Sequence, residues 1–263
     1  MFHVKHVPER FRELFHVKQF SSWGFAVAKQ RRFLTDMIYL DNAATTWPKP
    51  EETLEAVADC LRYKGANPGR GGYQMALAAG KLILESREML AKLFNIEDPA
   101  QVVFTGNATE SLNLALKGCL GTGDHVITTS MEHNAVARPL HVLRQRGVDV
   151  TILQLAPSGE FAVSDLEKAI RPNTKAIVMT HASNVTGSIL PIGEVGKATR
   201  SRGVLLIVDA AQTAGYLDID VQKMNIDILA FTGHKSLYGP QGTGGLCVRK
   251  GLELNPLKEG GTG

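Results

Sequence analysis

A lysine stands where a predicted core strand gives way to a turn, in FTGHKSLYGP at residues 231–240. The apolar run Ile226–Phe231 leads into this segment, whereas lysines normally occupy exposed positions where the ammonium group stays solvated. A lysine at the mouth of a dry pocket has a lowered pKa, so its neutral amine can add to a carbonyl group. Lys235 is therefore a candidate for imine chemistry, the alternative being a surface lysine that only lays its alkyl stem on apolar neighbours.

A second signal is a candidate anion site in TGNATES, which follows the apolar residues VVF. A strand, a glycine turn and a helix beginning near Thr109 would present free backbone N–H groups to an anion. Asn107 and Glu110 could instead form only a capping box, since neither a Walker lysine nor GxGxxG is present.

Three further polar residues follow predicted strands. His133 comes after HVITT and Asn184 after AIVMT, and each has a structural alternative, as a satisfied histidine or as a turn former. Asp209 directly follows five apolar residues, so its carboxylate needs a cationic or N–H partner to stay ionised.

Pyridoxal phosphate is a ligand that needs all five of these groups. Its phosphate suits a helix N-terminus, and its pyridinium nitrogen suits a buried carboxylate. Its flat ring can be stacked, its phenolic oxygen accepts hydrogen bonds, and its aldehyde condenses with a lysine. The constellation therefore predicts a pyridoxal-phosphate site at which Lys235 is the reactive amine.

The elements that would position these residues are short apolar runs alternating with helical stretches. The runs are VVFTG (102–106), HVITT (125–129), VTILQL (150–155), AIVMTH (176–181), VLLIVD (204–209) and DILAFTG (227–233). Such alternation indicates βαβ units and a parallel sheet covered on both faces, an α/β fold. Ligands bind outside the carboxyl ends of the strands in such sheets, where all five groups would lie.

Local signals predict the helices. A helix beginning at Pro50 would carry apolar residues at Leu54, Val57 and Leu61. After a loop at 67–72, a long helix runs to about Phe94. Within VSDLEKAI, Ser164 and Glu167 predict a capping box.

Composition excludes several classes of protein. A hydrophobic content of 44% and a charged content of 21% over 263 residues are typical of a globular chain. No stretch approaches the roughly 20 apolar residues of a membrane span. The three cysteines form no CxxC, which argues against a disulfide framework or a metal site and favours a reducing cytoplasm.

The positive charge is confined to the N-terminus. Residues 1–36 hold seven of the 29 Lys and Arg residues and three of the 26 acidic ones, leaving 22 basic and 23 acidic groups beyond them. We therefore expect no nucleic-acid partner. We interpret residues 1–36 as a disordered, nonfunctional extension, with organised sequence beginning after Met37.

Seven motifs together resemble the cysteine desulfurase-like branch of the class V aminotransferases. They are YLDNAATTWPKP, GANPGRGGY, FTGNATESLNLA, SMEHNA, HASNVTG, VDAAQTAG and FTGHKSLYGPQGTGGL. The resemblance runs from Ile38 to the last residue. It implies a three-layer αβα large domain at 37–263 with a mainly parallel seven-stranded sheet, in which about 38–70 is the N-terminal segment of a small domain.

The resemblance also assigns roles around the cofactor ring. It implies that Lys235 forms the Schiff base, Asp209 partners the pyridine nitrogen and Gln212 partners the phenolic oxygen. His133 would stack on the ring and move protons. Asn184 would lie beside the cofactor and the substrate.

A second set of residues would bind the phosphate. The resemblance implies this role for Ala108 and Thr109, and for Thr232 and His234 just before the lysine. Thr262 in the terminal GGTG would reach the phosphate of a partner subunit.

The chain departs from the family pattern after the lysine, where only 28 residues follow. Family members carry a sulfur-accepting cysteine and a substrate-binding arginine in a C-terminal small domain, which we expect to be absent here. Cys60 and Cys119 fall on helical stretches and Cys247 in the strand-like GGLCV, so none fits that nucleophile. We expect a cofactor domain that is impaired alone.

The resemblance implies conversion of L-cysteine to L-alanine, with sulfur passed to an enzyme cysteine and then to an acceptor protein. It also implies a homodimer, and we expect no membrane partner. Two alternatives stay open. One is another class V enzyme, an aminotransferase or a selenocysteine lyase, and the other is a non-catalytic remnant.

Overall fold

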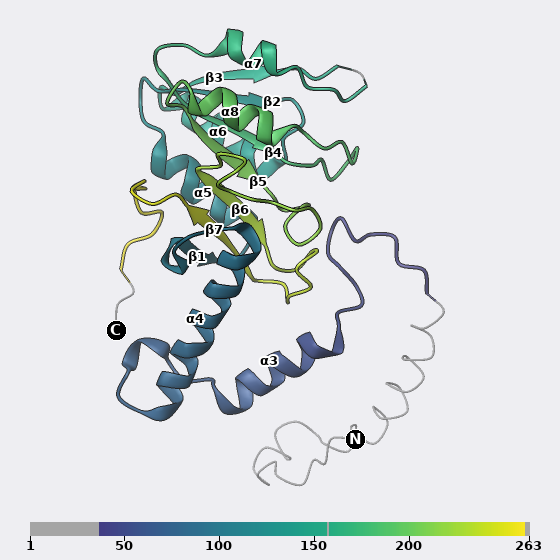
Figure 1. The fold of residues 1–263 in the computed structure, drawn as a ribbon, viewed down its shortest axis with the longest axis vertical. Coiled ribbons are helices and arrows are strands. Elements are labelled where there is room, and N and C mark those ends of the chain that lie inside the picture. Colours follow the sequence, from purple (N-terminus) through teal and green to yellow (C-terminus); the bar gives the residue numbers. More distant parts are fainter. Residues whose placement is uncertain (1–36, 157, 261–263) are drawn as a thin grey trace. The chain divides into compact units, whose positions relative to one another are not determined.

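The computed structural model describes residues 37–156 and 158–260 (Figure 1). The predictions for residues 1–36 and for Thr262 lie outside the described residues. The chain divides into two units, Met1–Leu40 and Asp41–Gly263, and the second contains all the elements described below.

A seven-stranded sheet forms the centre of this unit. Its strands are β1 (Val102–Thr105), β2 (His125–Thr129), β3 (Asp149–Leu153), β4 (Thr174–Thr180), β5 (Leu205–Asp209), β6 (Ile228–Thr232) and β7 (Gly244–Val248). They are ordered β1-β7-β6-β5-β4-β2-β3. Strand β7 runs antiparallel to both of its neighbours, and the other six described strands run parallel to one another. The prediction of a mainly parallel seven-stranded sheet is therefore confirmed.

The predicted helices are present, with two differences of detail. The helices are α3 (Glu51–Tyr63), α4 (Gln74–Phe94), α5 (Ala108–Cys119), α6 (Asn134–Gln145), α7 (Val163–Ala169) and α8 (Ile192–Arg200). Short 3₁₀ helices occupy Pro68–Arg70, within the predicted loop, and Pro99–Gln101. None of the described helices has the length and apolar character that a bilayer crossing requires.

The capping box predicted at Ser164 and Glu167 is wrong. The helix begins two residues earlier than this motif requires, because Ala162 is the N-cap of α7 and makes no side-chain capping bond. Ser164 therefore lies inside the first turn. Burial of Leu166, which is fully inaccessible, holds this short helix against the sheet in place of a polar cap.

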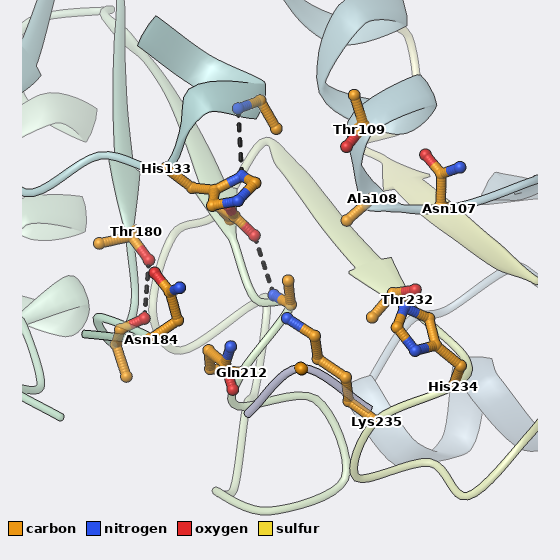
Figure 2. Close-up of a pocket in the computed structure, with 15 residues that line it drawn as sticks. Asn107, Ala108, Thr109, His133, Thr180, Asn184, Gln212, Thr232, His234 and Lys235 are labelled. Atoms are coloured by element: carbon orange, nitrogen blue, oxygen red, sulfur yellow. Dashed lines mark hydrogen bonds between the residues drawn. The ribbon is translucent and has the colours of Figure 1, made fainter. Parts of the chain in front are cut away.

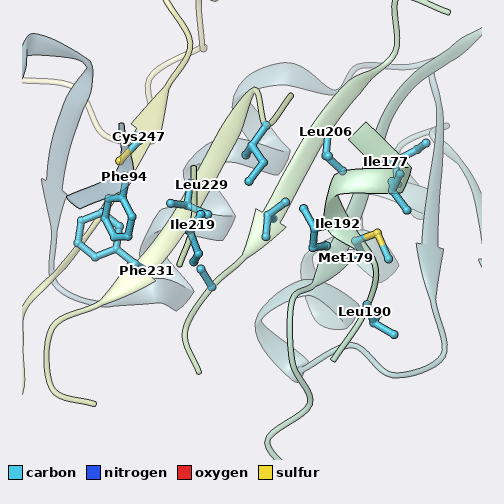
Figure 3. Close-up of a cluster of buried hydrophobic side chains, with 14 of the residues drawn as sticks. Phe94, Ile177, Met179, Leu190, Ile192, Leu206, Ile219, Leu229, Phe231 and Cys247 are labelled. Carbon is cyan, nitrogen blue, oxygen red and sulfur yellow. The ribbon is translucent and has the colours of Figure 1, made fainter. Parts of the chain in front are cut away.

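Alternation along the strands divides the core into two layers, one on each face of the sheet. On β5, Leu206 and Val208 join the cluster that contains Phe94 of α4 and Ile192 of α8 (Figure 3). Leu205 and Ile207 join the opposite cluster, which contains Leu112 and Leu116 of α5 and Leu140 and Leu143 of α6. The result is the predicted three-layer αβα arrangement.

Helix α3 forms where Pro50 predicts it but buries none of its side chains in the described part of the chain. Leu54, Val57 and Leu61 are 51%, 39% and 76% exposed. The apolar face inferred from the sequence is therefore present but does not pack against the core.

Two glycines of α8 provide a matched test of how closely this helix packs. A Cβ at Gly196 would overlap the carbonyl oxygen of Met224, whereas one at Gly193 would meet only Met224 Cγ at 3.9 Å. We expect Gly196→Ala to lower the free energy of unfolding by about 1–3 kcal/mol through overpacking. Gly193→Ala should be neutral or stabilising by up to about 1 kcal/mol, because alanine is the better helix former. Urea unfolding of both variants measures the difference, and equal midpoints would contradict this packing.

Candidate active site

A cavity of about 180 Å³ opens at the carboxyl ends of β4, β5 and β6. It contains nine of the residues predicted to bind a cofactor, which are Ala108, Thr109, His133, Asn184, Asp209, Gln212, Thr232, His234 and Lys235. The other lining residues are Asn107, which the sequence singled out only as a possible cap, and five that it did not single out: Ala44, Ala135, Thr180, Ala182 and Ala211. The predicted strand ends therefore meet at one place.

Lys235 extends from the turn after β6 toward the centre of the cavity (Figure 2). The turn is closed on itself, because Gly239 N–H donates to the Gly233 carbonyl at 2.8 Å and Tyr238 N–H to the Lys235 carbonyl at 2.8 Å. Partial burial lowers the pKa of the Lys235 amine, and the carboxylate of Asp209 opposes that shift. Because burial is the larger effect, the pKa of the amine is lowered overall, which favours the neutral, nucleophilic form.

Asp209 is the last residue of β5 and is only 4% exposed. Its Oδ1 accepts a hydrogen bond from Ala211 N–H at 2.9 Å. Desolvation raises the pKa of this carboxyl, although the Ala211 bond and the nearby His133 and Lys235 oppose the shift. The sequence predicted that this carboxylate would need a partner. The described residues provide one N–H donor and leave Oδ2 without one.

His133 is the N-cap of α6 and also lines the cavity. Its Nδ1 accepts a hydrogen bond from Ala135 N–H at 3.1 Å. Because a backbone N–H can only donate, the neutral ring carries its proton on Nε2. Since Nδ1 is held by Ala135, Nε2 is the nitrogen left to exchange a proton with a ligand. The ring lies above Lys235 in the view of Figure 2.

The N-terminus of α5 forms another wall of the cavity. Asn107 Oδ1 accepts from Glu110 N–H at 2.9 Å, and Glu110 Oε2 accepts from Gly106 N–H at 2.7 Å. The Asn107 cap, which the sequence offered as the alternative, is therefore present. The N–H groups of Ala108 and Thr109 belong to the first turn and have no acceptor in the described part of the chain. These groups can bind an anion.

The turn between β4 and α8 forms the side of the cavity opposite α5 (Figure 2). Thr180 donates its hydroxyl hydrogen to the Ala182 carbonyl at 2.9 Å. Asn184 is exposed, so its amide is open to a ligand from solvent.

Residues 43–49, here called the clasp, bind the turn that carries the lysine. Thr46 Oγ1 donates to the Lys235 carbonyl at 2.8 Å, and Lys49 Nζ donates to the His234 carbonyl at 2.7 Å. Gln212 Nε2 donates to the Ala43 carbonyl at 2.9 Å. The clasp holds the backbone on which Lys235 and His234 are mounted. The motif YLDNAATTWPKP covers these residues, but no role was predicted for them, because their partners lie about 170–190 residues away.

None of the three cysteines lines this cavity. Cys60 lies on α3, Cys119 ends α5, and Cys247 is buried on β7, as the sequence indicated. Burial raises the pKa of both Cys119 and Cys247 to about 12, so these two thiols stay protonated at neutral pH. The described residues also contain no group of three or more His, Cys, Asp or Glu residues able to hold a metal ion.

Comparison with known proteins accounts for this arrangement. Residues 38–263 match the family described as Aminotransferase class-V. A cysteine desulfurase IscS of Dictyoglomus turgidum is 38% identical over 229 residues, which cover 86% of this chain and 57% of that protein. A probable cysteine desulfurase of Methanothermobacter thermautotrophicus is 36% identical over 231 residues, or 87% of this chain and 57% of its own length.

Solved structures give the same result. The apo structure of a cysteine desulfurase from Thermococcus onnurineus is 33% identical with a TM-score of 0.82, and the match covers 86% of this chain and 57% of that one. The structure of SspA in complex with cysteine is 38% identical with a TM-score of 0.80, covering 86% and 65%. The chain belongs to the class V aminotransferase family. It spans 57% of the length of these two curated relatives.

Class V aminotransferases and cysteine desulfurases depend on pyridoxal phosphate, and the residues of this cavity fit that cofactor. Asp209 lines the cavity and its carboxyl accepts one hydrogen bond, at Oδ1, so Oδ2 is left to accept one from a protonated ring nitrogen. The first-turn N–H groups of α5 suit a phosphate. The amine of Lys235 suits an aldehyde, and its pKa is lowered.

Asp209→Asn tests whether the carboxylate serves a ligand or the fold. The amide can still accept the bond from Ala211, and it removes a charge that burial disfavours. Because the pKa of the Asp209 carboxyl is raised in the folded state, the wild-type protein loses stability as pH rises through that pKa. We therefore expect the cofactor-free variant to be at least as stable as wild type at pH 8, with the advantage shrinking toward pH 4. A thermal unfolding series across that range measures this, and a large loss of stability at pH 8 would make Asp209 a structural residue.

Proposed function

We propose that this chain is the cofactor-binding portion of a pyridoxal-phosphate-dependent cysteine desulfurase that acts on L-cysteine. The observation that carries the proposal is that one cavity holds the Lys235 amine, the Asp209 carboxylate and the free N–H groups of α5. The names of the relatives, and a related structure described as a complex with cysteine, support the choice of substrate.

Each part of the cofactor would have its own residues. Ala108 and Thr109 would bind the phosphate through their N–H groups, with Thr232 and His234 on the adjoining wall. Gln212 would bind the phenolic oxygen through the amide hydrogen that Ala43 does not use. His133 would cover the ring, and Asn184 would lie beside the substrate.

When bound, pyridoxal phosphate supplies an electron sink for the carbon that bears the amino group of an amino acid. Lys235 would carry a proton between positions of the substrate at Nζ, since its lowered pKa makes the neutral amine accessible. His133 would donate or accept a proton at Nε2, because Nδ1 is held by Ala135. Asp209 Oδ2 would keep the ring nitrogen protonated.

The thiol that receives sulfur would come from outside this set of cavity residues. A thiolate must approach the substrate sulfur closely, and misplacement can cost on the order of a hundredfold in rate. The three cysteines lie away from the cavity, so we infer that the chain alone desulfurates cysteine poorly. A homodimer, a sulfur-accepting protein and a cytoplasmic location belong to the same proposal. The apolar residues exposed on α3 support a homodimer, and the three unpaired cysteines support a cytoplasmic location.

Covalent labelling tests the proposed role of Lys235. After incubation with pyridoxal phosphate and reduction with borohydride, peptide mass spectrometry should locate a pyridoxyl group on Lys235. Lys235→Ala should abolish this labelling, while Lys197→Ala, which alters an exposed lysine on α8, should leave it unchanged. Equal labelling of the Lys235→Ala protein at Lys49 would contradict the assignment.

Product analysis tests the reaction and the cysteines together. With cysteine as substrate and a dithiol reductant present, which takes up the substrate sulfur and releases it as sulfide, we expect alanine and sulfide, and no keto acid, which an aminotransferase would release. Replacing Cys60, Cys119 and Cys247 by serine together should change the rate of alanine formation by less than about twofold, because none can reach the substrate. Loss of turnover on replacing any one of them would show that this cysteine reaches the site.

A further inference from the structure

Glu132 lies in the turn between β2 and α6, directly before His133. Its Oε1 accepts two hydrogen bonds, from Thr129 Oγ1 at 2.7 Å and from Thr180 N–H at 3.0 Å. These donors belong to the end of β2 and to the end of β4. One carboxyl oxygen therefore ties the histidine turn to a strand end that lines the proposed cofactor cavity.

The other oxygen, Oε2, is buried and has no hydrogen-bond partner among the described residues. Glu132 also lines a second cavity of about 220 Å³, together with Thr128 of β2 and His141 and Arg144 of α6. Thr128 Oγ1 is likewise buried without a partner in the described part of the chain. Glu132 thus lines the second cavity and is bonded to Thr180, which lines the first. Only its Oε1 accepts hydrogen bonds in the described part of the chain.

Burial raises the pKa of Glu132 to about 8. The bonds from Thr129 and Thr180 oppose this shift, and the negative charge of Asp209 on β5 adds to it. The charged or titratable groups that line the second cavity with Glu132 are His141 and Arg144. At neutral pH the carboxyl of Glu132 is therefore mostly neutral.

We propose that Glu132 is a positioning residue for the cofactor cavity, whose carboxyl holds the His133 turn against the end of β4. The cofactor part of this inference rests on the function proposed above. His133 follows Glu132 in the chain, and Thr180 donates its N–H to Glu132 Oε1. This oxygen therefore links the cavity wall that carries His133 to the wall that carries Thr180. Ionisation puts a charge on Oε2, where the described residues offer no donor, and places it near Asp209. The tie then becomes costly to keep.

Glu132→Gln keeps the shape and the accepting oxygen but cannot ionise, and Glu132→Ala removes the tie. In the cofactor-free wild type, the raised folded-state pKa means that stability is fully present below the unfolded pKa and is lost as pH rises to about 8. Glu132→Gln should therefore show a flatter thermal unfolding profile between pH 5 and pH 9. His141, Arg144 and Asp209 are common to both proteins, so their contributions cancel in the difference. Parallel profiles would overturn the assigned ionisation.

The positioning role is measured by equilibrium binding of pyridoxal phosphate, at a temperature where each protein is folded. Glu132→Gln should bind within about twofold of wild type at pH 7, and Glu132→Ala about tenfold more weakly, the effect of losing a buried hydrogen-bonded tie. From pH 7 to pH 9 the affinity of wild type should fall relative to that of Glu132→Gln. Wild-type affinity in Glu132→Ala, or a constant ratio between wild type and Glu132→Gln, would overturn the proposal.

The outcomes also separate this inference from the proposed function. If Glu132→Ala does not fold, the comparison of wild type with Glu132→Gln decides alone. If wild type is not labelled at Lys235, the proposed function fails. The unfolding profiles of the cofactor-free proteins still decide whether Glu132 is the ionising group that holds the turn.

Discussion

The site depends on one electrostatic constraint, which is a carboxylate buried at the end of a central strand. Asp209 pairs in register with Thr180 of β4 and Ala230 of β6, so strands flank it on both sides. A charge removed from water is costly unless positive charge or hydrogen-bond donors surround it. The neighbouring His133 and Lys235 and the N–H of Ala211 meet part of that demand. A ligand with a cationic N–H donor would meet the rest.

A second carboxyl, that of Glu132, shows how the protein limits the charge near Asp209. Two ionised carboxylates close together in a desolvated region repel each other, and each raises the pKa of the other. Here the carboxyl that accepts two hydrogen bonds is the one that is mostly neutral at pH 7. Asp209 lies on the strand end where a ligand can reach it.

Much of the fold and site followed from the sequence because the signals were local. Unbroken apolar runs such as VLLIVD predict buried parallel strands, and the residue after each run lies at the ligand edge. The short helix α7 was harder, because burial of Leu166 decides its start and the Ser164 motif does not. Glu132 was missed because a glutamate in a turn usually faces solvent, and only the tertiary structure buries Oε2.

The contacts of the clasp could not be predicted because its partners lie far away in the chain. This separation has a consequence during synthesis of the protein. Thr46 and its partner Lys235 are 189 residues apart in the chain. At a translation rate of roughly 5–20 residues per second, about 10–40 s separate the appearance of the two from the ribosome. During that interval Thr46 and Lys49 have not yet met the carbonyl groups of residues 234 and 235 to which they donate. The reactive lysine is therefore fixed in place only after the strands that surround it have been made.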